Sequence, residues 1–232
     1  MSDLAPRQNV KFDRNGQTIS GYLQLPPQGR GPGLIVIQEW WGLDDHMVSI
    51  VDRFAAEGFV ALAPDLYGGQ VTHSTDEAGQ MLQALPVEAS AAQLAGAVDY
   101  LLEQDSVTSD KVGAVGFCMG GGFVLLLATE RPDQVGAVVP FYGVGPAVPQ
   151  TYEKIAAPVQ GHYGEQDQGY PVADAQAQET QIRNEAGVEV TYFYYPAGHA
   201  FLNDDNHLGT YDPESGALAW SRTVEFLHAQ LG

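Results

Sequence analysis

The lone cysteine of the chain, Cys118, lies in a Gly-x-Cys-x-Gly sequence that runs from Gly116 to Gly120. The apolar run Val112–Phe117 before it suits a buried strand, and the segment 120–130 after it has helical spacing. A Gly-x-Cys-x-Gly sequence between a strand and a helix is typical of a nucleophile elbow, with cysteine in place of the usual serine. The turn is so sharp that a side chain at Gly116 or Gly120 would clash with the backbone. The start of a helix favours a thiolate, so the pattern predicts a cysteine nucleophile.

Cys118 also has a plainer interpretation as a small residue buried in the core. For an arbitrary lone cysteine this interpretation is the usual one. The strand, the elbow and the apolar helix in succession favour the nucleophile here. One cysteine cannot form an internal disulfide and offers no cysteine cluster for zinc or an iron–sulfur centre. We therefore expect neither a metal nor a cofactor.

An acid and then a histidine follow the nucleophile along the chain in enzymes with this elbow. The predicted strand Pro158–Tyr163 leads into a loop with Glu165 and Asp167, and Val188–Tyr195 leads into a Pro-x-Gly turn and His199. Both loops should open at the carboxyl edge of the sheet, beside the cysteine. His199 would take the thiol proton or pair with the thiolate, and Asp167 would fix its tautomer. Glu165 remains the rival for the role of orienting acid.

The other histidines compete poorly for the role of general base. His46 and His73 precede the nucleophile, and His162 falls within a predicted strand. His207 lies beyond the expected turn, and His228 lies near the end of a terminal helix. His199 thus stands out because it directly follows a strand.

Strand-like and helix-like segments alternate along the chain. We expect strands at 18–25, 33–38, 59–63, 112–117, 135–142, 158–163 and 188–195, and helices at 46–57, 87–103, 120–130, 171–185 and 213–230. This alternation predicts a mostly parallel central sheet with helices on both faces, which is an α/β fold. The polar, glycine-containing segment Gly68–Ala84 is the best candidate for a mobile cover over a site.

Composition narrows the possible partners. The chain of 232 residues carries a net charge of −19 with only 10 Lys and Arg, which argues against binding a nucleic acid. The first ten residues resemble no signal peptide, and no apolar run approaches the ~20 residues of a membrane span. We therefore expect a cytoplasmic protein with no membrane partner. The oligomeric state stays open, with a monomer as one option.

The sequence resembles the dienelactone hydrolase family, whose members include carboxymethylenebutenolidases, over nearly its whole length. The matching segments, in the family's order, are Gln38–Gly42, Pro64–Tyr67, Gly116–Gly122, Phe141–Gly145, Gly164–Asp167 and Ala197–Phe201. The resemblance implies a single α/β-hydrolase domain over residues 1–232. It also implies a catalytic triad of Cys118, Asp167 and His199.

The same resemblance implies roles for residues around the triad. Glu39 is expected to contact the resting thiol, and the backbone N–H groups of Trp40 and Met119 are expected to form an oxyanion hole. An N–H that follows the nucleophile is the usual donor, so the argument from the elbow agrees on Met119. We also expect Tyr142 and Phe201 to contact the substrate.

Two positions depart from the family pattern. Hydrolases of anionic dienelactones carry an arginine two residues after the tyrosine of the Pro-Asp-Leu-Tyr segment and another four residues after the catalytic histidine. Here those positions are Gly69 and Asn203, so the paired donors for a carboxylate are missing.

The leading expectation is hydrolysis of a small ester or lactone through an acyl-enzyme. A thioesterase or general carboxylesterase with the same triad is the alternative, and a noncatalytic binding or redox-sensing protein is an alternative of another class.

Overall fold

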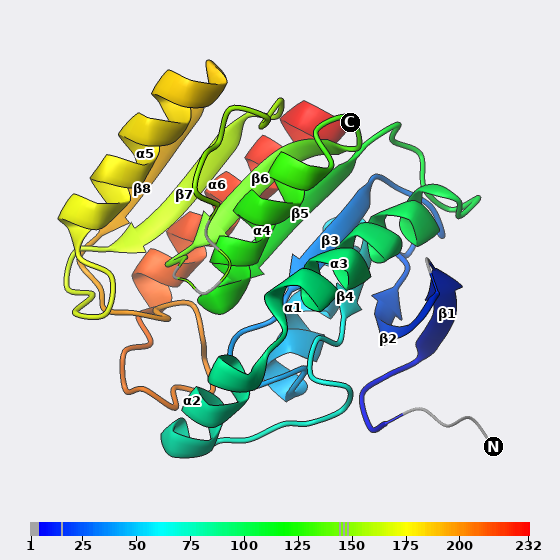
Figure 1. Cartoon of the computed structure of the whole chain (residues 1–232), viewed down its shortest axis with the longest axis horizontal. Coiled ribbons are helices and arrows are strands. Elements are labelled where there is room, and N and C mark those ends of the chain that lie inside the picture. The colour runs from blue at the N-terminus through cyan, green and yellow to red at the C-terminus, as the bar shows by residue number, and fades with distance from the viewer. Residues whose placement is uncertain (1–4, 15, 144, 146, 148) are drawn as a thin grey trace.

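The computed structural model describes residues 5–14, 16–143, 145, 147 and 149–232. A sheet of eight strands, in the order β1-β2-β4-β3-β5-β6-β7-β8, crosses the described part of the chain (Figure 1). The strands are β1 (Val10–Arg14), β2 (Gln17–Gln24), β3 (Gly33–Ile37), β4 (Val60–Pro64), β5 (Val112–Phe117), β6 (Val135–Phe141), β7 (Val159–Gly164) and β8 (Val190–Tyr195). The helices are α1 (Asp45–Ala56), α2 (Thr75–Ala84), α3 (Val87–Leu102), α4 (Met119–Glu130), α5 (Val172–Ala186) and α6 (Pro213–Leu231).

The neighbours from β4 to β8 pair in parallel, whereas β2 pairs antiparallel with both β1 and β4. Every residue of β3, β4 and β5 is buried. Unbroken apolar runs are what a strand covered on both faces requires, so these three strands form the centre of the sheet. The mostly parallel sheet predicted from the alternation is confirmed.

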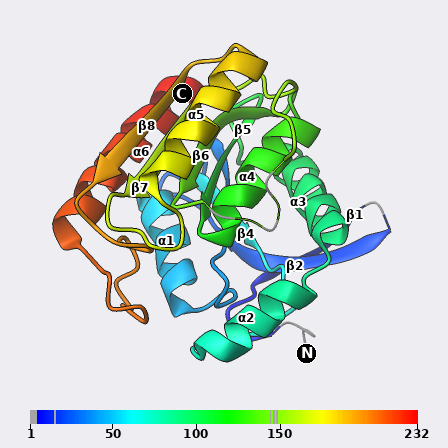
Figure 2. The same cartoon turned by 60° about the vertical axis from the view of Figure 1, so that its left-hand side comes forward.

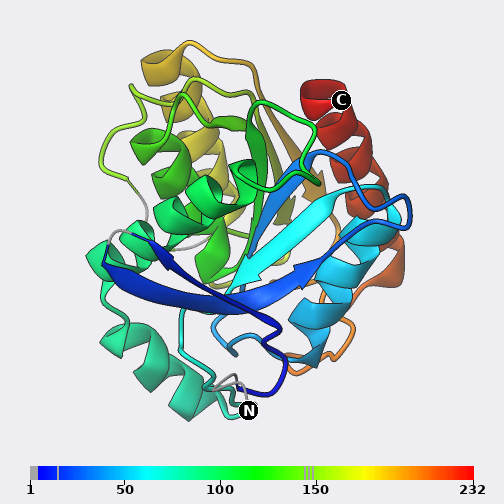
Figure 3. The same cartoon turned by 90° about the vertical axis from the view of Figure 1, so that its right-hand side faces the viewer.

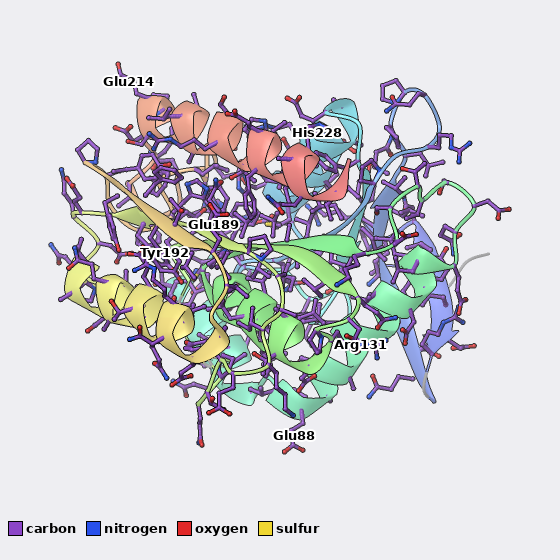
Figure 4. The ribbon with its side chains drawn as sticks, turned by 90° about the horizontal axis from the view of Figure 1, so that it is seen from above. Glu88, Arg131, Glu189, Tyr192, Glu214 and His228 are labelled. Atoms are coloured by element: carbon purple, nitrogen blue, oxygen red, sulfur yellow. The ribbon has the colours of Figure 1, made fainter. Side chains whose placement is uncertain are left out.

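Helices cover both faces of this sheet. α3, α4 and α5 lie on one face and α1 and α6 on the other, as the view from above shows (Figure 4). One core cluster packs apolar side chains of α3, α4 and α5 against the sheet. The second cluster does the same for α1 and α6. The carboxyl ends of the parallel strands are thereby held in fixed relation to one another.

Two elements were not anticipated from the sequence. β1 forms a hairpin with β2 along the edge of the sheet (Figure 3). Its residues include Lys11, Asp13 and Arg14, and only Phe12 is buried, so the apolar signal of a strand is weak there. The helix α2 lies within the segment predicted as a polar cover, and Ser74 caps it by accepting a hydrogen bond from Glu77 N. No helix in the residues that the structure describes is long and apolar enough to cross a bilayer.

Candidate active site

Cys118 lies at the junction of β5 and α4 with the positive backbone angle φ of 54°. A non-glycine residue adopts this conformation rarely, and it costs free energy that the surrounding packing must supply. A Cβ atom at Gly116 would lie 2.0 Å from Gly120 O, and one at Gly120 would lie 2.4 Å from Ile37 O. The elbow therefore requires both glycines, as the sequence predicted. The Cys118 N–H donates to Phe141 O over 3.1 Å, which fixes the turn against β6.

The two loops after β7 and β8 bring Asp167 and His199 together. Glu165 N donates to Tyr195 O and Gln166 N donates to Ala197 O, so the loops are joined backbone to backbone. His199 Nδ1 lies 2.6 Å from Asp167 Oδ2. Of the two acids that the sequence left open, Asp167 is the one bonded to this ring. The side chain of Glu165 is exposed instead.

Asp167 is fixed from its other side as well. Its Oδ1 accepts hydrogen bonds from Gly169 N at 2.8 Å and Tyr170 N at 2.9 Å. Burial by itself would raise the pKa of Asp167, but the hydrogen bond with His199 and these N–H groups outweigh burial and lower the pKa below its usual value. The carboxylate is therefore both ionised and oriented toward the ring.

The charge on His199 follows from the same contact. Burial would lower the pKa of His199, but the hydrogen bond with Asp167 and the nearby thiol of Cys118 outweigh burial and raise the pKa to about 10. Because Nδ1 is bonded to Asp167, Nε2 is the ring nitrogen left to exchange a proton with a neighbour. Imidazole and thiol line one cavity.

This cavity has a volume of about 340 Å³ and is lined by Trp40, Leu82, Cys118, Gly169, His199 and Leu208. Its wall is mostly apolar, and no lysine or arginine is among these lining residues. Leu82 belongs to α2, so the segment predicted as a cover does reach the site. Leu82, Gly169 and Leu208 were not anticipated, because each comes from a loop or helix whose approach to Cys118 depends on tertiary packing.

Glu39 is completely buried beside the elbow, and both of its oxygens have donors. Tyr142 Oη donates to Oε1 over 3.1 Å, and Asn203 Nδ2 donates to Oε2 over 2.7 Å. Burial raises the pKa of Glu39 above its usual range, and the nearby His46 and the hydrogen bond from Asn203 oppose this rise. No hydrogen bond joins Glu39 to Cys118 within the described residues. Asn203, at the position of an expected arginine, thus holds Glu39.

The remaining predicted residues fall into two groups. Trp40 lies in the loop after β3, and Met119 is the first residue of α4. No acceptor contacts the N–H of either residue within the part of the chain that is described. Tyr142 and Phe201, predicted to contact substrate, are fully buried, and their rings lie 5.4 Å apart. Neither is among the residues that line the cavity, although the ring of Tyr142 lies 5.2 Å from that of His199, so their contact with substrate stays a prediction.

Comparison with known proteins places this geometry in a family. The Dienelactone hydrolase family matches residues 19–231. A protein named usf from Aquifex pyrophilus is 36% identical over 97% of this chain and 99% of its own, and a carboxymethylenebutenolidase from Pseudomonas sp. (strain P51) is 30% identical over 92% and 91%. Among solved structures, a dienelactone hydrolase-like promiscuous phosphotriesterase from metagenomic libraries has a TM-score of 0.84 and 27% identity, covering 97% of this chain and 98% of its own. This chain therefore belongs to the dienelactone hydrolase family and has the α/β-hydrolase fold.

Proposed function

We propose that this hydrolase cleaves small, uncharged esters or lactones, with Cys118 as nucleophile, His199 as general base and acid, and Asp167 as the residue that orients His199. The observation that carries the proposal is the 2.6 Å hydrogen bond between His199 Nδ1 and Asp167 Oδ2 at the cavity that Cys118 lines. A redox-sensing cysteine needs no base positioned by an acid, so this pair favours catalysis. A family whose members include carboxymethylenebutenolidases supports an ester or lactone as substrate.

In the proposed acylation step, Cys118 reacts as the thiolate of an ion pair with His199, whose Nε2 already holds the proton, and the sulfur attacks the substrate carbonyl carbon. The carbon–oxygen bond of the ester then breaks, and the leaving oxygen takes the proton from His199. In deacylation, a water molecule gives a proton to His199 and attacks the thioester. The carbon–sulfur bond then breaks, the acid product leaves, and the sulfur departs as a thiolate beside the protonated His199.

The negative oxygen of each tetrahedral intermediate would accept hydrogen bonds from Trp40 N–H and Met119 N–H. Both N–H groups flank the elbow, and the described residues offer them no competing acceptor. One such donor typically lowers the barrier by about 3 kcal/mol. We assign to Glu39 the role of a positioning residue in the resting enzyme, because hydrogen bonds from Tyr142 and Asn203 hold its carboxyl group beside the elbow.

The apolar wall of the cavity supports the neutral substrate. A carboxylate needs paired donors such as a guanidinium, but no lysine or arginine is among the residues that line the cavity. Gly69 has a positive φ of 93°, and a Cβ atom there would lie 2.6 Å from Ala5 Cβ, so this site leaves little room for a side chain. Asn203 is occupied by Glu39. Both positions that carry arginine in hydrolases of anionic dienelactones therefore serve other purposes here.

The proposal is tested with Cys118→Ala and Cys118→Ser on p-nitrophenyl acetate, with far-UV circular dichroism as the check on folding. We expect Cys118→Ala to lose turnover at native ellipticity, because only the attacking sulfur is removed. Native ellipticity with retained turnover would show that another group is the nucleophile. One release of p-nitrophenol per chain without turnover in the wild type would favour the noncatalytic alternative. A panel of esters and thioesters separates the carboxylesterase and thioesterase alternatives.

A further inference from the structure

Three side chains beside the active site lie close enough to share one cation. Within the described residues, Asp44, His73 and His207 each offer a ligand atom, and these three atoms lie within 4.8 Å of one another. The sequence predicted no metal site, because it has no cysteine cluster and these three residues are too far apart along the chain to suggest one. Folding alone brings them together.

Asp44 supplies the strongest indication that this cluster binds a ligand. The residue is 1% exposed, and its Oδ1 accepts the hydrogen bond from Met47 N that caps α1. Its Oδ2 is buried and has no hydrogen-bond partner among the described residues. A buried carboxylate oxygen without a donor costs free energy, so such groups are normally paired or bound to a cation. The oxygen lies on a side chain that already faces two imidazoles.

His207, like Asp44, has a buried polar atom without a hydrogen-bond partner among the described residues. Its Nε2 is buried and makes no hydrogen bond within the part of the chain that is described. The nearest acid is Asp205, whose Oδ2 lies 3.6 Å away, which is too far for a hydrogen bond. The ring of His73 stacks on that of His207 with centroids 4.3 Å apart. Two imidazoles and a carboxylate are therefore adjacent, with an additional acid close by.

We propose that Asp44, His73 and His207 bind one divalent transition-metal ion of the zinc class. Two imidazole nitrogens and one carboxylate oxygen are a common ligand set for zinc when a fourth position is left to water. Tetrahedral ligands about 2.1 Å from zinc lie roughly 3.4 Å from one another, so distances of up to 4.8 Å in the cluster must shorten by up to about 1.4 Å. His73 is exposed and can make that movement. A hard cation such as Mg²⁺ prefers oxygen ligands and fits this set less well.

The site would join three loops that border the cavity. Asp44 follows the loop of Trp40, His73 directly precedes α2, and His207 precedes the cavity residue Leu208. The segment near 205 and α2 lie toward the same end of the molecule (Figure 2). Two contacts already link these loops through Trp41, whose carbonyl accepts from Thr72 N and whose ring lies 5.3 Å from that of His207. A bound ion would therefore fasten the cover to the rest of the site.

The test is calorimetric titration of Zn²⁺ into chelator-treated protein. Every sample carries Cys118→Ala, because a thiolate is itself a zinc ligand and would confuse the readout. We expect one Zn²⁺ per chain and a rise in melting temperature with Zn²⁺, since a ligand that binds only the folded state stabilises it. Mg²⁺ at the same concentration should give neither effect.

Three variants locate the binding. His73→Ala and His207→Ala should each weaken Zn²⁺ binding by at least about tenfold, the smaller end of what loss of even a supporting residue costs a metal site. His228→Ala, an exposed histidine on α6, should leave binding unchanged. If His207→Ala fails to fold, the exposed His73 still provides the test. Failure of the parent protein to bind Zn²⁺, or equal binding by parent and His73→Ala, would overturn the proposal. Because the readout is binding, its failure is distinct from failure of the proposed hydrolysis.

Discussion

Two histidines in neighbouring parts of the fold differ in charge near neutral pH, because His162 is neutral and His199 is protonated. His162, within β7, is held by Tyr195 Oη at 2.8 Å and Thr223 Oγ1 at 3.0 Å. Burial, with a smaller contribution from the charge of Arg222, lowers the pKa of His162 to about 3. His199, near the start of the loop after β8, has its pKa raised to about 10. Both rings are largely removed from water, so burial alone does not decide the charge.

The difference is the carboxylate. Asp167 faces His199, whereas His162 has neutral partners and a cation nearby. Hydroxyl groups satisfy a neutral imidazole inside the core, but only an anion makes an imidazolium stable there. In the proposed function, the histidine inside a strand serves packing, and the histidine in a loop at the sheet edge serves proton transfer. The following predictions test that division.

Asp167→Asn should have the largest effect. The amide keeps the shape of the side chain but cannot support an imidazolium, so kcat should fall by about a thousandfold to ten thousandfold. Steady-state kinetics with p-nitrophenyl acetate measure this. The matched control is Glu165→Gln, an exposed acid two residues away, which should leave kcat nearly unchanged. The reverse result would make Glu165 the orienting acid.

His162→Ala should act on stability instead of catalysis. The change leaves a cavity and removes the shared partner of Tyr195 and Thr223, which should lower the free energy of unfolding by about 2–4 kcal/mol. Urea denaturation measures this loss, and kcat of the folded fraction should stay near the wild-type value. A fall in kcat comparable to that of Asp167→Asn would contradict the division between the two histidines.

The sequence predicted the site better than its surroundings. The apolar runs of β3 and β5 and the glycines around Cys118 carry local physical signals, because a doubly covered strand and a strained turn restrict residue type. β1 and α2 carry weak apolar patterns, so they were missed. The contacts of Glu39 with Tyr142 and Asn203, and the wall residues Leu82 and Leu208, depend on long-range packing that no local pattern reports.

The charge of the substrate tests the electrostatics of the cavity around His199, in addition to the contact of His199 with Asp167. Neutral esters should exceed carboxylate-bearing analogues of similar size by about ten to a hundredfold in kcat/KM, equivalent to roughly 1.4–2.7 kcal/mol. The physical reason is that the cavity wall offers no lysine or arginine, and the chain carries a net charge of −19. Measuring both substrates at low and high salt is informative, because screening should narrow the gap. Faster turnover of the anionic substrate at low salt would mean that an arginine reaches the pocket.

The smallest expected effect is a pH dependence of stability. A folded-state pKa of about 10, against 6.5 for an unperturbed histidine, means that protonation of His199 stabilises the fold fully below pH 6.5 and that this contribution is lost as pH rises toward 10. Asp167→Asn removes the part of that contribution that comes from Asp167. The gap in unfolding free energy between wild type and Asp167→Asn should therefore be larger at pH 6.5 than at pH 9.5. Urea denaturation at both values checks this, and a gap that widens with pH would refute the assigned shift.

The most direct test of the central claim is to trap the acyl group. Wild-type protein is mixed with excess p-nitrophenyl acetate, quenched in acid within the first turnover, and analysed by peptide mass spectrometry. We expect one acetyl group on the peptide containing Cys118, and none on that peptide in Cys118→Ala. Sustained hydrolysis with an unmodified Cys118 peptide at every quench time, or acetylation of another residue that rises and falls with turnover, would contradict the account.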